Sequence, residues 1–234
     1  MTDTSFLYVI ICGFLSGLFI PAIASRFGKV LPADPGLVLA HLWHKPVKPR
    51  GDDVIRYALW QYKWKKLKFF SLCWGLIMAA LWACAYVYIG PSFIGWTGGF
   101  LLIIGFLIAV DQQYFLLPDF FTIPLLFLGF GFAVSTGLLS VNDSFYGSVF
   151  GYLLCTLSVW IMNYIFKKAE FGAGDVKMVT ALGAWLGYTN LNITLLLSFI
   201  FFAIWGMITG RRSGAFGPAL GLAAIIMLFI TYVK

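Results

Sequence analysis

Long apolar runs constrain this chain more than any other feature of its sequence. Hydrophobic residues fill 61% of the 234 positions and charged residues only 11%, whereas soluble domains are roughly 45–50% apolar and about 25% charged. A hydrocarbon core about 30 Å thick needs about 20 apolar residues per helix. We therefore expect an all-α fold, a polytopic membrane helical bundle with about eight transmembrane helices. Their predicted ranges are 5–25, 69–89, 93–110, 120–140, 145–166, 176–188, 192–209 and 215–233.

The basic residues predict the orientation of these helices. Ten of the sixteen Lys and Arg residues lie between the first two predicted spans, and with eight spans only Lys234 falls on the opposite side. Because loops rich in Lys and Arg remain in the cytoplasm, we expect both termini outside. The net charge of +7 then reflects this orientation and the anionic headgroups of the lipid bilayer, and we expect no nucleic-acid partner.

Three segments follow from this arrangement: a first transmembrane helix at 1–26, a basic amphipathic cytoplasmic loop at 27–68, and a seven-helix membrane core at 69–234. The loop mixes aromatic and basic residues, as interfacial helices do. His41 and His44 lie three residues apart in this loop, but no further His or Cys completes a ligand set. The four cysteines all lie in apolar runs without a C-x-x-C pair, so neither a metal site nor a disulfide framework is expected.

Four of the nine acidic residues lie at or near the predicted cytoplasmic helix ends: Asp111, Asp119, Glu170 and Asp175. The helix dipole favours an acid at a helix N-terminus, which accounts for Asp119 and Asp175, but it disfavours Asp111 at a helix C-terminus. A carboxylate near the hydrocarbon edge is costly and is a functional candidate. Topology alone leaves two interpretations open, namely hydrated helix ends and a joint site.

A pair of carboxylates that shares one proton is the reacting unit of aspartyl proteases. This chemistry needs no metal, nucleophilic side chain or organic cofactor, and the chain has no convincing serine–histidine or cysteine–histidine arrangement. Gly172 and Gly174 precede Asp175 and allow the backbone to unwind, to take a positive φ, or to approach another helix or an extended substrate. Packing between small residues of membrane helices is the alternative explanation for these glycines.

Three segments resemble those of the type IV prepilin leader peptidases, polytopic aspartyl proteases that share a G-x-G-D motif with the preflagellin peptidases. The segments are AVDQQYFLLPDFFTIPLL (109–126), EFGAGDVKMVTALGAWLG (170–187) and GAFGPALGLA (214–223). The resemblance implies that Asp111 and Asp175 are the catalytic pair. It implies supporting or substrate-positioning roles for Asp119, Gly172, Gly174, Glu170, Lys177 and Pro218.

The resemblance also implies a reaction and a location. The enzyme would cut type IV prepilin or pseudopilin precursors after a glycine, where the leader meets the hydrophobic helix, at the cytoplasmic face of the bacterial inner membrane. Proteolysis would need no cofactor. Many relatives also methylate the new N-terminus, so S-adenosylmethionine is expected if that activity is retained; the loop at 27–68 lacks the C-x-x-C pairs that many relatives carry.

Two other classes of function compete with a peptidase. A proton- or ion-coupled transporter would use the carboxylates as a relay, but it predicts acids near the middle of the bilayer. An inactive scaffold for pilus or secretion assembly would not require the two aspartates of the motifs. The sequence leaves the oligomeric state open.

Overall fold

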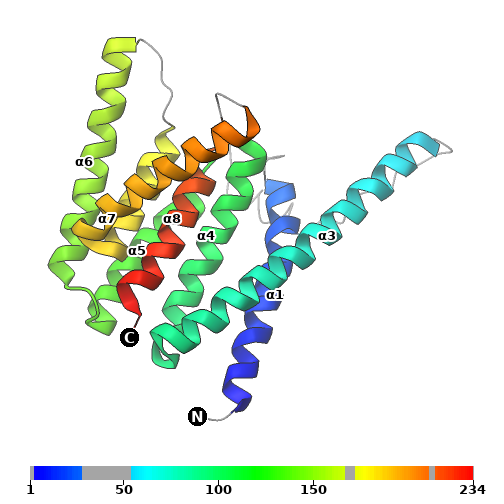
Figure 1. Cartoon of the computed structure of the whole chain (residues 1–234), viewed down its shortest axis with the longest axis horizontal. Coiled ribbons are helices and arrows are strands. Elements are labelled where there is room, and N and C mark those ends of the chain that lie inside the picture. Colours follow the sequence, from blue (N-terminus) through cyan, green and yellow to red (C-terminus); the bar gives the residue numbers. More distant parts are fainter. Residues whose placement is uncertain (1–2, 28–53, 167–171, 211–213, 234) are drawn as a thin grey trace. The chain divides into compact units, whose positions relative to one another are not determined.

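The computed structural model describes residues 3–27, 54–166, 172–210 and 214–233, and every regular element in these ranges is a helix. A π-helical turn, η1 (Ala85–Ile89), and a 3-10 turn, η2 (Pro91–Phe93), precede α4. The α-helices, shown in Figure 1, are α1 (Asp3–Phe27), α3 (Val54–Cys84), α4 (Ile94–Tyr114), α5 (Asp119–Thr136), α6 (Val141–Phe166), α7 (Ala173–Thr209) and α8 (Gly217–Tyr232).

The chain divides into two compact units, Met1–Ala83 and Cys84–Lys234. In the first unit α1 packs against α3 through small residues, since a Cβ atom on Gly17 would clash with the backbone of Trp74. Such close approaches are typical of paired membrane helices. Residues 28–53 of the predicted loop lie outside the described residues, and residues 54–68 form the start of α3.

The second unit is built around the fully buried side chain of Trp185 in α7. Its indole N–H donates a hydrogen bond of 2.8 Å to the carbonyl oxygen of Leu125 in α5, and its own carbonyl oxygen accepts a hydrogen bond from the Tyr232 hydroxyl of α8. The ring stacks on Phe132 of α5 at a centroid distance of 5.0 Å and packs against Phe100 of α4. These contacts join α4, α5, α7 and α8 into one core.

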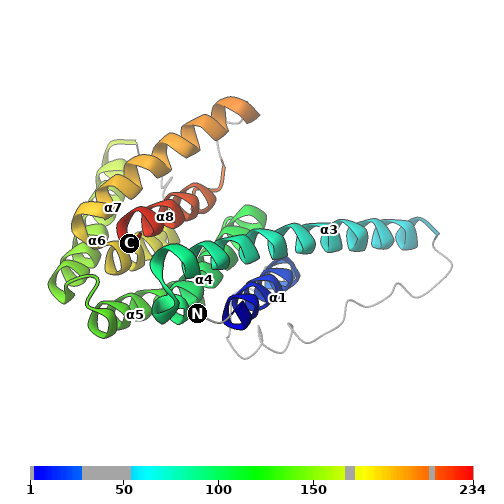
Figure 2. The same ribbon diagram turned by 60° about the horizontal axis from the view of Figure 1, so that its bottom comes forward.

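A sharp bend divides α7 at Gly187. This residue has φ 74° and ψ 176°, a combination that is essentially restricted to glycine. The yellow first half and the orange second half of α7 meet at this bend in Figures 1 and 2. The two halves correspond to the predicted spans at 176–188 and 192–209, and the chain turns at Gly187 rather than in the predicted connection at 189–191.

The bend brings both termini of α7 to the same end of the second unit. The first turn of α7 packs on Leu117, between α4 and α5. Beyond the other terminus of α7, Gly217 is hydrogen bonded to Asp111 in the last turn of α4. Gly187 instead contacts Leu139, between α5 and α6. We term the first of these two ends the carboxylate end; it comprises residues 111–119, 172–177 and 214–217.

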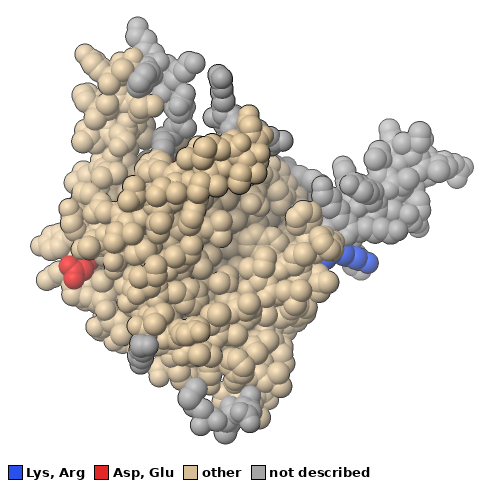
Figure 3. Space-filling model, viewed as in Figure 1, with Lys and Arg blue, Asp and Glu red and all other residues tan. Residues whose placement is uncertain are grey.

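Six helical segments in the described part of the chain are long and apolar enough to span a membrane, and α8 is a shorter apolar helix of 16 residues. The face drawn in Figure 3 shows almost no charged side chains among the residues it describes. With the two halves of α7 counted separately and α8 included, the helices match the eight predicted ranges. The prediction of an all-α, polytopic membrane bundle is confirmed.

Candidate active site

Asp111 lies in the last turn of α4 and is only 5% exposed. The helix ends just after it, because Phe115 takes a left-handed φ of 55° and donates its N–H to the Asp111 carbonyl oxygen at 2.9 Å. A carboxylate at this position faces the negative end of the α4 dipole. A hydrogen-bond donor from elsewhere in the fold is therefore needed to stabilise it.

That donor is the backbone N–H of Gly217, which lies 2.8 Å from Asp111 Oδ2. Gly217 is the first residue of α8, where backbone N–H groups have no helical partner and the helix dipole is positive. The N-terminus of α8 thus offsets the unfavourable end of α4. A Cβ atom at position 217 would lie 2.6 Å from the same carboxylate oxygen, so this approach requires glycine.

Asp175 is the third residue of α7 and is half-buried. Its Oδ2 accepts a hydrogen bond of 3.3 Å from the N–H of Gly172, while its own N–H donates to the Gly172 carbonyl oxygen at 3.1 Å. This reciprocal pair caps the start of α7 in the manner of a capping box. Asp175 therefore also lies at the positive end of a helix dipole.

The structure brings Asp111 and Asp175 together at the carboxylate end. Their carboxylates are near enough for the two charges to interact, although the residues lie on helices separated by α5 and α6 in the sequence. The arrangement has the components that a carboxylate dyad requires.

Asp119 and Lys177 form a salt bridge next to this pair. The Lys177 Nζ lies 2.7 Å from Asp119 Oδ1 and 2.6 Å from Oδ2. The side chain of Lys177 is 44% exposed and that of Asp119 is 54% exposed. Asp119 is the first residue of α5 and Lys177 lies in the second turn of α7. The ion pair links the starts of these two helices.

The two glycines before Asp175 adopt different arrangements, and Gly172 does not take a positive φ. Gly172 is the extended residue before α7, with φ −76° and ψ 146°, and it is exposed. Gly174 lies inside α7, where a Cβ atom would be 2.8 Å from the Cβ of Leu117. The space that glycine opens at position 174 is thus filled by the protein itself. At Gly174, glycine therefore permits close packing against the segment between α4 and α5, and not against a small residue of another membrane helix.

The remaining predicted site residues are Pro218 and Glu170. Pro218 follows Gly217 in the first turn of α8 and lines a cavity beside Asp111; Glu170 lies outside the described residues. Sequence reasoning missed Gly217, because its contact with Asp111 is made by the backbone N–H, which no residue type signals. No group of three or more potential metal ligands occurs among the described residues.

Comparison with known proteins identifies the family. The model of the type IV leader peptidase family matches residues 97–207. A prepilin leader peptidase/N-methyltransferase of Escherichia coli (strain K12) is 31% identical over 225 residues, which cover 94% of this chain and 93% of the relative. The chain belongs to the type IV leader peptidase family. The prediction of an enzyme, a peptidase, is thereby confirmed.

Other members of the type IV leader peptidase family match a shorter part of the chain. Proteins with the same name from Pseudomonas aeruginosa and Aeromonas hydrophila are 38% and 37% identical over 145 residues. These matches cover 57% of this chain and 50% of each relative. No solved structure matches the chain. The family membership favours the peptidase over the transporter and scaffold interpretations.

Proposed function

We propose that this protein is an aspartyl endopeptidase in which Asp111 and Asp175 together activate a water molecule. The observation that carries the proposal is the meeting of these two carboxylates at one end of the bundle, each hydrogen bonded to a backbone N–H at a helix start. The backbone groups hold the carboxylates in place without using any side chain. Each carboxylate accepts its backbone hydrogen bond through Oδ2, and we assign its Oδ1 to water and substrate.

The reaction uses the pair with one shared proton. The ionised carboxylate takes a proton from water as the water oxygen attacks the carbonyl carbon of the scissile peptide bond. The protonated carboxyl group donates its proton to the carbonyl oxygen. When the tetrahedral intermediate collapses, the C–N bond breaks and the departing nitrogen receives the proton that was removed from water. One hydroxyl of the intermediate returns its proton to the other carboxylate as the C=O bond re-forms, which restores the pair with one shared proton. No metal or organic cofactor enters these steps.

The proposed substrates are type IV prepilin or pseudopilin precursors, cut after a glycine where the leader meets the hydrophobic helix. The names of the relatives support this substrate class. A precursor helix can lie among membrane helices while its basic leader stays in the cytoplasm, so we place the carboxylate end at the cytoplasmic face of the bacterial inner membrane. The exposed, extended Gly172 beside Asp175 suits an extended substrate backbone at the bond to be cut.

Methylation of the new N-terminus is a named activity of the relatives, and it would require S-adenosylmethionine. This compound carries an ammonium group, a carboxylate and a ribose. The cavity beside Asp111 offers the amide of Gln112 but no acidic or basic side chain for these groups. The described residues at this cavity do not fit the cofactor, and we assign no methylation step to them.

Substitution of either aspartate tests the proposed dyad. We expect Asp111→Asn and Asp175→Asn each to abolish processing of a prepilin precursor produced in the same cells, because an amide neither accepts the proton from water nor donates an acidic proton. The amount of membrane-inserted enzyme should stay unchanged. Precursor and product are separated by immunoblotting, and mass spectrometry of the product gives the new N-terminus.

Asp143→Asn is the matched control. Asp143 is an exposed carboxylate in the first turn of α6, hydrogen bonded to Ser140, and it lies away from the carboxylate end. Its substitution should leave processing at the level of the unaltered chain. Normal processing by either Asp111→Asn or Asp175→Asn would refute the dyad, and cleavage elsewhere than after a glycine would refute the proposed substrate specificity.

A further inference from the structure

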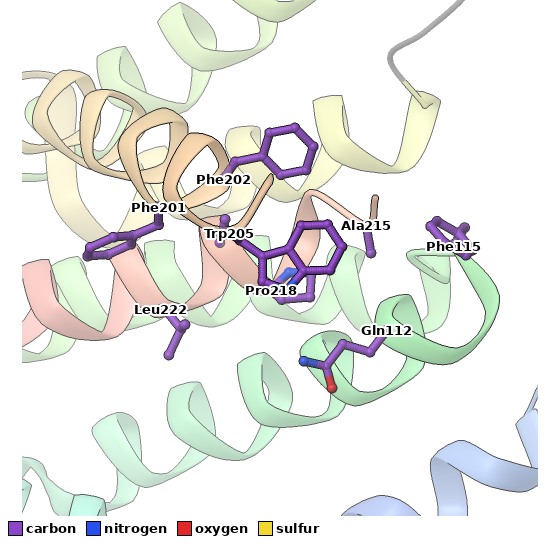
Figure 4. A pocket seen from close by; sticks show the side chains of 9 residues that line it. Gln112, Phe115, Phe201, Phe202, Trp205, Ala215, Pro218 and Leu222 are labelled. Atoms are coloured by element: carbon purple, nitrogen blue, oxygen red, sulfur yellow. The ribbon is translucent and has the colours of Figure 1, made fainter. Parts of the chain in front are cut away.

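A cavity of about 210 Å³ opens beside the candidate active site, between the last turn of α4, the second half of α7 and the start of α8. Figure 4 shows Trp205 of α7 beside Pro218 of α8, with Gln112 of α4 facing them. Leu222 of α8 and Phe115 at the end of α4 also line the cavity, and both are exposed. The cavity is therefore open to a molecule that approaches the bundle from outside.

Two residues that line the cavity directly follow, in the sequence, the two residues that form the Asp111–Gly217 hydrogen bond. Gln112 directly follows Asp111 in α4, and Pro218 directly follows Gly217, whose N–H is bonded to Asp111 Oδ2. A substrate backbone that presents a peptide bond to Asp111 and Asp175 would thus carry its neighbouring side chains to the cavity entrance. The cavity is therefore within reach of a substrate that is bound at the two carboxylates.

The lining selects an apolar side chain. Phe201, Phe202 and Trp205 form one wall from α7, and Ala219 and Leu222 contribute from α8. Phe202 also packs against both Trp205 and Phe216, which fixes this wall in place. A dry cavity of about 150 Å³ lined by apolar residues holds a benzene molecule. The volume here is therefore enough for one large aliphatic or aromatic side chain, but not for a helix.

We propose that this cavity binds an apolar side chain from the first turn of the precursor's hydrophobic helix, directly after the scissile bond. The assignment rests on the proposed peptidase function. The glycine before the bond has no side chain to bind, and the basic leader finds no acidic group in the lining. Only the residues after the bond combine apolar chemistry with the required nearness to Asp111, so the cavity helps to position the bond.

Narrowing the cavity tests this assignment in the full chain. Leu222→Trp fills part of the cavity from an exposed position, so folding should be preserved. The control is Ile226→Trp, one helical turn further along α8, where the exposed side chain does not line the cavity. Two precursors are compared, one with large apolar residues at the first four positions after the scissile glycine and one with alanines there.

We expect Leu222→Trp to lower kcat/KM for the precursor with large residues, and this decrease should exceed the decrease for the alanine precursor by about tenfold. Apolar pockets discriminate between side chains on this scale. Ile226→Trp should leave this ratio unchanged. In a second experiment, four precursors each carry a photoreactive benzophenone residue at one of the four positions, and each precursor is bound to the Asp175→Asn variant. At least one should cross-link to the second half of α7 or the start of α8.

Two failures are distinguishable. If the unaltered chain cleaves neither precursor, the proposed peptidase function is wrong and the subsite falls with it. If the unaltered chain is active but the two tryptophan variants have the same precursor preference, the cavity is not a substrate subsite. Cross-links that map only to other helices would overturn the assignment in the same way, with the peptidase function intact.

Discussion

Gly217 determines how closely a backbone donor can approach Asp111. Its N–H lies 2.8 Å from the carboxylate, and a Cβ atom there would lie 2.6 Å from the same oxygen. In Gly217→Ala the carboxylate must therefore move or rotate. Because a misplacement of about 1 Å costs roughly 100-fold in rate, we expect kcat for precursor cleavage to fall by about that factor, with little change in KM.

Gly99→Ala provides the matched control for this substitution. Gly99 also lies in a membrane helix, α4, but nothing lies within 4 Å of the position that its Cβ would occupy. Alanine is favoured over glycine inside a helix by roughly 0.5–1 kcal/mol, so this variant should be folded and fully active. Steady-state cleavage by both purified variants checks the difference. Equal activity would mean that the Gly217 contact does not position Asp111.

At the scale of elements, the salt bridge between Asp119 and Lys177 fastens the start of α5 to the start of α7. Both side chains are about half exposed, and exposed ion pairs contribute about 0.2–1 kcal/mol. We therefore expect Asp119→Asn to slow cleavage by no more than about fivefold, in contrast to the complete loss in Asp111→Asn. Initial rates of precursor cleavage in membranes provide the measurement.

Reversal of the two charges separates this positioning role from a chemical one. The double variant Asp119→Lys/Lys177→Asp should cleave faster than either single variant, because the pair re-forms. Recovery should be incomplete, since a cation at the start of α5 opposes the helix dipole. If Asp119→Asn were as inactive as Asp111→Asn, Asp119 would belong to the reacting groups.

The bend at Gly187 is the second feature that decides how the elements are arranged. A straight helix of 37 residues would carry the chain about 55 Å, far beyond the hydrocarbon core of about 30 Å. The conformation of Gly187 instead returns the second half of α7 toward the carboxylate end. Gly217 can reach Asp111 only because α7 both begins and ends there.

For the molecule as a whole, the sequence predicted the features that depend on composition along the chain. Apolar runs located the helices because each run must match the membrane thickness, and Asp111 was recognised as unusual because an acid at a helix C-terminus is unfavourable. The three-dimensional contacts were beyond this reasoning. Nothing in the apolar sequence around Trp205 distinguishes a side chain that lines a cavity from one that faces lipid, since both environments select the same residues.

The partner of Asp111 shows the same limit. The Phe-Gly-Pro segment pointed to Pro218, but the hydrogen-bonding group is the backbone of the preceding residue, Gly217. Every residue except proline carries a backbone N–H, so the sequence does not mark this donor and only the fold reveals it. The glycines before Asp175 drew attention as flexible positions, whereas the space at Gly174 accommodates Leu117.

The arrangement of the second unit also predicts the topology of the whole chain. The start of α7 and the start of α8 both lie at the carboxylate end, so we expect α7 to cross the membrane twice. With one crossing each for α1, α3, α4, α5, α6 and α8, the expected number of crossings is eight. Lys167, Lys168, Arg211 and Arg212 lie in the segments that precede these two helices, which favours a cytoplasmic carboxylate end. We therefore expect both termini outside.

An epitope tag at each terminus of the full chain tests this topology. When spheroplasts are treated with protease, both tags should be digested. Digestion of one tag alone would require an odd number of crossings, and protection of both would require the opposite orientation.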